Sequence, residues 1–457
     1  MTFTYSGSAP VVGELYTITL LDTVTGILTQ VGAGDVTNLA ATFCFTYGNK
    51  EYLLASEKVF FSEIGEPTKW NNPNGIGNGN VTMTDQFSTP ENLVAIAPYQ
   101  GRLAFFSRQT TQIWQVDADP ANWAQLQVMQ NIGCVAPLSV QPLGNLDVLF
   151  LSDGGVRSLR ARDSSLNAYV DDVGSPIDSY VATLVDAAFT GVTVVYTTGV
   201  FTDVAHGLAE GAAVEFKAGT LPGGLAENTT YFVRDVTDDT FKIASYPEGL
   251  ALVFTVSNGA SIMYRKSLGG ACAIVEPVSG QYWLYFDGVI YALSYYPSAK
   301  VQAWSKLLPT LGASQATAFV PSKFTVWRGR VYCRAVDNLG DPYIICYGDP
   351  DGGSASYDDA VVTAELPWMA LKTPGTRKTA EGLSVAITGA WTFKGCMDPQ
   401  SAPIYETITS ITGTSFDINR IAWTAQGTHL KIQAITTGST AAVLSSLLVN
   451  YEQNEEM

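Results

Sequence analysis

The sequence predicts an all-β fold in which short strands alternate with tight turns. Two observations predict it: 42 glycines and 21 prolines are spread along the 457 residues, and helical periodicity is rare. Frequent turn formers between short apolar runs are typical of strands rather than of long helices. One short helix is expected at 175–185, with Ser175 as its N-cap and Pro176 in its first turn.

A hairpin motif recurs along the chain and indicates a repeating architecture. Each copy places a glycine third in an eight-residue strand–turn–strand unit, at Gly101, Gly154, Gly288 and Gly329. Glycine is expected there because a two-residue hairpin turn needs positive φ, which a side chain resists. Repeats of a few antiparallel strands at this spacing predict a β-propeller-like main domain.

The spacing of these glycines predicts an insertion. Gly101 and Gly154 are 53 residues apart, whereas Gly154 and Gly288 are 134 apart. Removing about 80 residues from the longer gap restores the shorter spacing, as expected for a domain inserted between repeats. The predicted domains are the two parts of the main domain, 1–185 and 267–365, the inserted small β-domain, 186–266, and a C-terminal β region, 366–457.

Local patterns within the last two regions also predict strands. In the insertion, residues 229–244 alternate around the pair Asp238-Asp239, which is typical of a β-hairpin. In the C-terminal region we expect strands of a further sheet at 391–393, 415–418 and 430–435.

Composition and charge bound the functional classes. Hydrophobic residues make up 46% of the chain and charged residues 15%, so we expect a large buried core. The net charge of −17 disfavours tight binding of nucleic acid, because such binding relies on a surplus of Lys and Arg. We expect weak affinity for duplex DNA; any basic patch would be tested first at Arg377 and Lys378. An acidic surface suits a protein that DNA slides past, and ordinary solubility explains it equally well.

Compartment and membrane signals are weak. The N-terminal residues lack the pattern of a secretory signal, and the apolar stretches are too short to span a bilayer, so we expect no membrane insertion. The six cysteines contain no Cys-x-x-Cys pair, which disfavours zinc and favours buried thiols in a reducing cytoplasm: Cys44, Cys134, Cys272, Cys333, Cys346 and Cys396.

No constellation of catalytic or ligating residues stands out. The two histidines, His206 and His429, are expected in turns rather than beside a nucleophile. Asp117-Ala-Asp-Pro and Asp349-Pro-Asp-Gly-Gly are similar to calcium loops but do not continue into a full ligand series. Residues 74–80 are glycine-rich without the Lys-Ser/Thr of a phosphate loop, and we interpret them as a mobile loop. The sequence therefore predicts no catalytic, cofactor-binding or metal residues, no cofactor, and a chain that is not an enzyme.

Several segments, in order, resemble the tail nozzle (tail tube-closing) proteins of short-tailed bacteriophages. They cover most of 50–450 outside the insertion and include 59–70, 101–107, 112–116, 132–137, 150–156, 304–306 and 374–378. The insertion itself resembles a small β-module of phage tail proteins, on the segments His206-Gly-Leu, Leu221-Pro-Gly-Gly-Leu and Tyr231-Phe-Val and on Gly211. Residues 1–50 match no part of this pattern.

The resemblance implies a structural virion protein built on a β-propeller. Such a nozzle is usually a homo-hexameric ring that extends the channel of the portal and adaptor rings, retains the packaged genome and passes duplex DNA at ejection. It would be assembled in the host cytoplasm and would offer sites for tail fibres or spikes. Two alternatives stay open: a receptor-binding or polysaccharide-depolymerising tail spike, and a non-viral propeller that serves as an interaction module. The number of copies in the assembled particle discriminates among the three: six support the nozzle, three a spike and one a free module.

Overall fold

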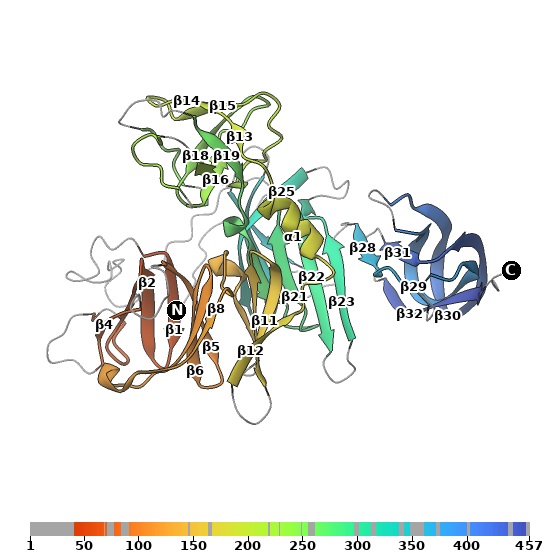
Figure 1. The fold of residues 1–457 in the computed structure, drawn as a ribbon, viewed down its shortest axis with the longest axis horizontal. Helices are drawn as coiled ribbons and strands as arrows, with labels where there is room; N and C mark the ends of the chain where they lie inside the picture. The colour runs from red at the N-terminus through yellow and green to blue at the C-terminus, as the bar shows by residue number, and fades with distance from the viewer. Residues whose placement is uncertain are drawn as a thin grey trace, which may run out of the picture. The chain divides into compact units, whose positions relative to one another are not determined.

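The computed structural model of the chain describes residues 41–67, 69–70, 77–83, 91–144, 147–162, 167–217, 220–227, 229–247, 249–254, 261–296, 301–311, 317–337, 342–347, 361–371, 375–399, 403–436 and 442–453. These residues form an all-β fold with a single α-helix among them, drawn in Figure 1. The predicted fold class is confirmed: a β-propeller-like main domain carries an inserted small β-domain and a C-terminal β-sheet region.

Sheets of four consecutive strands repeat through the main domain. The first is β1 (Phe43–Tyr47), β2 (Lys50–Ala55), β3 (Lys58–Phe61) and β4 (Gly79–Thr82). The second is β5 (Leu93–Tyr99), β6 (Arg102–Ser107), β7 (Thr110–Gln115) and β8 (Ala124–Gln130). The third is β9 (Gln141–Leu143), β10 (Asp147–Ser152), β11 (Gly155–Arg162) and β12 (Asn167–Asp172).

Two further sets of four strands follow the insertion. One is β20 (Cys272–Val275), β21 (Tyr282–Phe286), β22 (Val289–Tyr296) and β23 (Val301–Leu307). The other is β24 (Thr310–Leu311), β25 (Thr317–Trp327), β26 (Arg330–Asp337) and β27 (Pro342–Cys346). Sequential four-stranded sheets of this kind are the repeating unit of a propeller.

The glycines of the recurring hairpin do not all play the predicted role. Gly101, Gly288 and Gly329 have φ of 74°, 81° and 74°, as a two-residue turn requires. The prediction is wrong at Gly154, since the positive φ, 118°, belongs to Gly155, which pairs with Ser152. A Cβ on Gly155 would lie 1.8 Å from the Oδ1 of Asp178, so the approach of that carboxylate also requires glycine there.

The predicted repeat spacing compares turns that are not equivalent. The turn at Gly101 joins the first and second strands of its sheet, whereas those at 153–154, 287–288 and 328–329 join the second and third. In the sheet β5–β8 the equivalent turn is Arg108-Gln109, between β6 and β7. Since tight turns close several of the strand pairs in such a sheet, glycine alone does not identify which pair it closes.

The expected helix exists but begins later than predicted. Helix α1 spans Asp178–Val185, its N-cap is Ile177, and no side chain caps it. Ser175 and Pro176 instead lie in a preceding turn, which the carbonyl of Gly174 closes by accepting from the amides of Ile177 and Asp178 at 2.7 and 3.0 Å. The N-cap prediction for Ser175 is therefore wrong.

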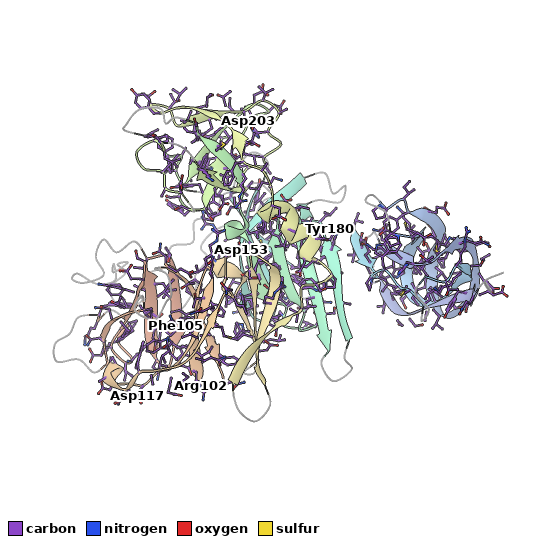
Figure 2. All side chains as sticks on the ribbon, in the orientation of Figure 1. Arg102, Phe105, Asp117, Asp153, Tyr180 and Asp203 are labelled. Atoms are coloured by element: carbon purple, nitrogen blue, oxygen red, sulfur yellow. The ribbon has the colours of Figure 1, made fainter. Side chains whose placement is uncertain are left out.

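The sheets β9–β12 and β20–β23 of the main domain share one apolar core with helix α1. The Nε1 of Trp304 on β23 donates to the carbonyl of Val173, 2.9 Å away, and the hydroxyl of Tyr282 donates to the carbonyl of Ser139 at 2.8 Å. Tyr180 of α1, labelled in Figure 2, packs on Tyr291 of β22 with ring centroids 5.8 Å apart. Leu149, Leu151, Val156, Leu284 and Leu293 lie in the same buried cluster.

The inserted domain has its own seven-stranded sheet and its own core. Its order is β13-β19-β16-β17-β18-β15-β14, from β13 (Thr190–Gly191), β14 (Thr193–Val195), β15 (Val200–Thr202), β16 (Ala213–Lys217), β17 (Tyr231–Arg234), β18 (Thr240–Ala244) and β19 (Met263–Lys266). Strands β17 and β18 form the hairpin expected around Asp238-Asp239. Phe201, Phe216 and Phe241 centre its apolar cluster, with Phe201 stacked on Phe241 at 5.3 Å.

The C-terminal region continues the sheet of the main domain. Strand β28 (Val362–Glu365) pairs with β23 on one side and with β31 (Leu430–Thr436) on the other. Strands β29 (Lys378–Met397) and β30 (Glu406–Gly427) are far longer than the segments predicted there, and β32 (Val443–Gln453) pairs with β29. Register shifts interrupt the β29–β30 ladder at several points, which explains why the sequence pattern shows only fragments of these strands.

Candidate functional site

The structure places the two predicted histidines in connections between strands, where each makes local contacts. The Nδ1 of His206 accepts from the amide of Leu208 at 3.0 Å, and its ring packs edge-on against Phe241. His429 lies beside Thr428, whose hydroxyl is 3.0 Å from the Nδ1 of His429. Both rings therefore shape local turns.

The turn at His429 is organised by a carboxylate that the sequence did not single out. The Oδ1 of Asp398 accepts from the amide of Thr428 at 2.6 Å, from its hydroxyl at 2.7 Å and from the amide of His429 at 3.2 Å. Burial tends to raise the pKa of Asp398, but these hydrogen bonds to the charged form outweigh it and lower the pKa below its usual range.

A pH dependence follows from this lowered pKa. Since the folded pKa lies below the unfolded value of about 3.9, Asp398 contributes stability at neutral pH that is lost as the pH falls through the folded pKa. Asp398→Asn is expected to lower the urea midpoint at pH 7, and the difference from the wild type should shrink as the pH falls below about 4. Glu452→Gln, on an exposed carboxylate of the same sheet, is the control; an equal effect of both variants at both pH values would contradict the assignment.

The predicted calcium loops and the glycine-rich segment have structural roles where they are described. The Oδ1 of Asp117 accepts from the amide of Asp119 at 2.9 Å, and Asp119 caps the 3₁₀ helix Pro120–Asn122. Residues 349–353 lie outside the described residues, as do 74–76. Gly77 is not part of a free loop: its carbonyl accepts from the buried Nζ of Lys50 at 2.7 Å, so the interpretation of a mobile loop is wrong from that residue onward.

Of the two residues named as the first to test for a basic patch, Arg377 and Lys378, the second is not available at the surface. Lys378 is 1% exposed, and its Nζ donates to the carbonyls of Thr376 and Thr428 at 2.8 and 3.3 Å. Arg377 is exposed. Because its amine is buried and bonded to backbone carbonyls, Lys378 cannot contact a phosphate.

Most of the thiols are buried in the structure. Four cysteines are buried as predicted, whereas Cys44 is exposed and Cys346 half-buried. Burial raises the pKa of Cys134 to about 12, which keeps this thiol protonated and unreactive. No group of three or more His, Cys, Asp or Glu side chains among the described residues is placed to hold a metal ion. None of the described helices is long and apolar enough to cross a membrane.

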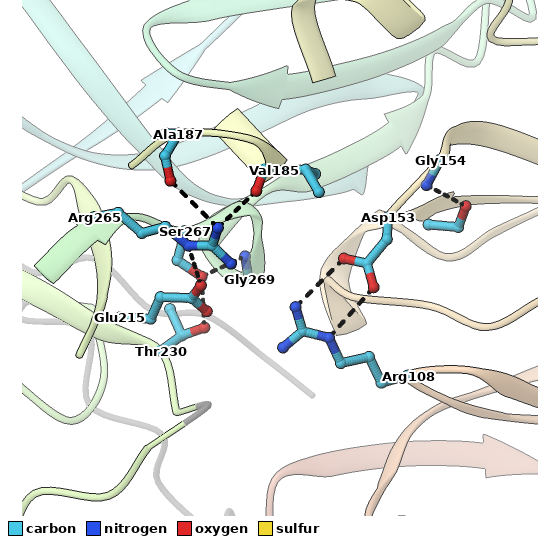
Figure 3. A network of polar contacts seen from close by, with 11 residues as sticks. Arg108, Asp153, Gly154, Val185, Ala187, Glu215, Thr230, Arg265, Ser267 and Gly269 are labelled. Atoms are coloured by element: carbon cyan, nitrogen blue, oxygen red, sulfur yellow. Dashed lines mark hydrogen bonds and ion pairs between the residues drawn. The ribbon is translucent and has the colours of Figure 1, made fainter. Parts of the chain in front are cut away.

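The most elaborate polar arrangement is the junction where the inserted domain meets the main domain (Figure 3). The Nε of Arg265 on β19 donates to the Oε1 of Glu215 on β16 at 2.6 Å, and its Nη1 donates to the carbonyl of Val185 at 2.6 Å. A guanidinium is suited to this place because its planar set of donors reaches acceptors on two sides. Arg265 thereby ties the sheet of the insertion to the C-terminal end of α1, whose last carbonyls lack partners within the helix.

Further contacts hold the same junction. The Nζ of Lys266 is 2.7 Å from the Oδ1 of Asp287, in the turn between β21 and β22, and the hydroxyls of Thr230 and Ser267 are 3.1 Å apart. Gly211, with φ of 78°, lies so close to Val336 that a Cβ would be 2.7 Å from its Cγ2. A cavity of about 370 Å³ lies at this junction and is lined by residues of both domains, among them Phe232 of the insertion and Tyr285 of the main domain. The inserted domain is thus docked on the main domain by charge and packing.

A second ion pair links two sheets of the main domain. Arg108, in the turn between β6 and β7, pairs with Asp153, in the turn between β10 and β11, at 3.4 Å (Figure 3). Both side chains are about 40% exposed. An exposed pair of this length contributes on the order of 0.5 kcal/mol, so it fixes the relative position of the turns rather than the stability of the fold.

Comparisons with known proteins find remote structural similarity and no match of sequence to a known family. No family model matches the chain, and no curated protein matches it. Among solved structures, an exo-β-1,3-galactanase from Phanerochaete chrysosporium with bound galactose is 10% identical, covers 94% of this chain and 98% of its own, and has a TM-score of 0.22. A glycoside hydrolase is 8% identical with 89% and 96% coverage and a TM-score of 0.16. The extracellular domain of a two-component system from B. thetaiotaomicron is 8% identical with 84% and 85% coverage and a TM-score of 0.17.

These neighbours correct one prediction. The expectation that the chain is not an enzyme is contradicted, because the solved structures that it is similar to include glycoside hydrolases. The prediction relied on missing histidine and metal constellations, whereas hydrolysis of a glycoside needs only two suitably spaced carboxylates, which are not recognisable in a sequence with 42 acidic residues. TM-scores of 0.22 and below assign neither an activity nor a substrate to this chain.

Proposed function

We propose that this chain is a structural ring component of a bacteriophage tail, the nozzle that extends the portal and adaptor channel. The observation that carries the proposal is the position of the segments that resemble nozzle proteins. Segment 59–70 covers the end of β3 and the turn after it, 101–107 covers β6, 150–156 covers the β10–β11 hairpin, and Trp304 lies on β23. The resembling segments thus fall on several of the repeated sets of four strands.

The position of the inserted domain supports the same proposal. It leaves the main domain after β12 and α1 and returns at β20, so it interrupts a connection between two repeating sheets and leaves both sheets complete. A module placed in this way can be presented to fibres, spikes or neighbouring rings without altering the propeller-like domain. The net charge of −17 suits a channel that lets DNA pass without retaining it by phosphate contacts.

The number of copies in the assembled particle tests the proposal. Mass photometry of the purified chain, with and without the portal and adaptor rings, is expected to detect particles of six copies. Three copies would favour the tail spike alternative, and a chain that stays single under all conditions would favour a free interaction module. Either result would overturn the nozzle.

A further inference from the structure

The last four-stranded sheet of the main domain has an unusual solvent face. In the register of β25 and β26, Lys323 lies opposite Arg334, Thr325 opposite Tyr332, and Trp327 opposite Arg330. Residues directly opposite each other share a face of an antiparallel sheet. The other face, which carries Phe324, Val331 and Cys333, is buried against the sheet of β20–β23. Cations and aromatic rings therefore alternate across the side that faces solvent.

This face is exposed over most of its area. Trp327 is 45% exposed, and Ile344, which lies opposite Arg334 on β27, is 63% exposed. The guanidinium of Arg328 stacks on the ring of Trp327 at 4.4 Å, and that ring meets Tyr332 edge-on at 5.8 Å. At its far end the sheet is covered, because Val336 packs beside Gly211 of the inserted domain. The open part, between that contact and the 328–329 turn, is called here the basic-aromatic face: Lys323, Trp327, Arg328, Arg330, Tyr332, Arg334 and Ile344.

The positive charge of the basic-aromatic face favours an acidic partner. Among the described residues, no carboxylate lies within ion-pair distance of Lys323, Arg328 or Arg330. Lys323 and Arg328 are exposed, so a carboxylate on a docking partner can reach both of them. Hydrogen bonds in which both the donor and the acceptor are charged are stronger than neutral ones, so an acidic partner would be favourable here.

The composition of the face fits a protein rather than a nucleic acid. Exposed Trp, Tyr and Arg together are the residues that dominate the binding energy of protein interfaces. Exposed apolar side chains such as Ile344 add an apolar centre of the kind that such interfaces bury. Nucleic acid binding would need more cations, working against a net charge of −17.

We infer that the basic-aromatic face docks on an acidic surface of a second copy of this chain, and that this contact joins neighbouring subunits of the ring. The inference rests on the proposed function. A chain with 42 acidic and 25 basic residues is a complementary partner for a face on which Lys323, Arg328 and Arg330 have no carboxylate within ion-pair distance among the described residues. Copies of so acidic a chain otherwise repel each other, so a local basic face both permits the contact and selects the side on which it forms.

Charge reversal tests the inference. The double variant Arg328→Glu/Arg330→Glu is expected to raise the dissociation constant of the six-copy particle at least 10-fold, measured by mass photometry at 50 mM salt. Trp327→Ala should weaken assembly in the same direction without any change of charge. In the wild type, an increase to 500 mM salt should also shift particles toward single copies, because the contact is electrostatic.

A matched control is available within the chain. Arg102 follows the turn at Gly101 as Arg330 follows the turn at Gly329, each as the first residue of its strand. Arg102→Glu is expected to leave the copy number unchanged, and the thermal midpoint of every variant is measured to exclude unfolding. Should a charge-reversed variant fail to fold, Arg330→Gln and the salt series give the same readout.

The outcomes separate the inference from the proposed function. Six-copy particles of both the wild type and the charge-reversed variant would overturn the inference that the basic-aromatic face joins subunits. The same result would leave the proposed nozzle function unaffected. If the charge-reversed variant loses the wild type's binding to a 30-base-pair DNA duplex while its assembly is unchanged, the face binds nucleic acid instead and the inference is overturned. A wild type that remains a single copy would overturn both.

Discussion

Replacing Arg265 with methionine is expected to lower the free energy of unfolding by about 3 kcal/mol, because Glu215 then remains buried without its cation. The side chain of Glu215 is 7% exposed and that of Arg265 is 19% exposed. The variant also removes the donors to the carbonyls of Val185 and Ala187 at the end of α1. Urea unfolding measures the loss, and hydrogen exchange at the amides of β16 and β19 locates it at the junction.

Lys242→Met is the matched control for this prediction. It breaks an ion pair of similar length in the same inserted domain, since the Nζ of Lys242 is 2.8 Å from Asp235. These side chains are 31% and 55% exposed, so the expected loss is about 0.5 kcal/mol or less. Equal losses for the two variants would show that burial of Glu215 does not decide the strength of the Arg265 contact.

Replacing residues 186–266 with a short Gly-Ser linker is expected to leave a main domain that is soluble and melts cooperatively. The inserted domain buries its own core around Phe201, Phe216 and Phe241, and none of these residues belongs to the core of the main domain. Exposure of Val336, which is 3% exposed in the complete chain, and loss of the Lys266–Asp287 pair should cost about 1–3 kcal/mol. Circular dichroism and the thermal midpoint report the result.

Several linker lengths serve as the control for the deletion, since doubling a flexible linker costs only about 0.6 kcal/mol in closure. Assembly is scored separately from folding, because the insertion can contribute to docking without contributing to the core. Insoluble or molten protein at every linker length would mean that the segment is part of the main core. It would also remove the reason for treating 186–266 as an insertion.

The sequence predicted what depends on local chemistry. Turn glycines such as Gly288 and the hairpin around Asp238-Asp239 were predicted correctly because φ preference and alternation act within a few residues. The start of α1 was predicted incorrectly, because a turn closed by the carbonyl of Gly174 lies where Ser175 was expected to cap the helix. The positive φ at Gly155 was missed because the hairpin pairs Ser152 with Gly155, so the residue with positive φ lies one position later than the sequence pattern indicated.

The junction and the basic-aromatic face depend on contacts that are distant in the sequence. Arg265 donates to the carbonyl of Val185, which lies 80 residues earlier in the sequence, and no pattern near either residue predicts this contact. Arg330 and Trp327 are close in sequence, but their common face follows only from the register of β25 and β26. Lys378 illustrates the reverse case, since a basic residue in a polar segment proved to be buried.

The location of the chain in an assembled particle tests the nozzle most directly. Phage particles from a host that carries this sequence would be labelled with an antibody raised against the inserted domain, 186–266, and imaged by electron microscopy. The nozzle predicts label at the distal end of the tail and six-fold density for a ring in line with the portal and adaptor channel. Label on three-fold appendages at the side of the tail, or particles that contain none of the chain, would contradict it.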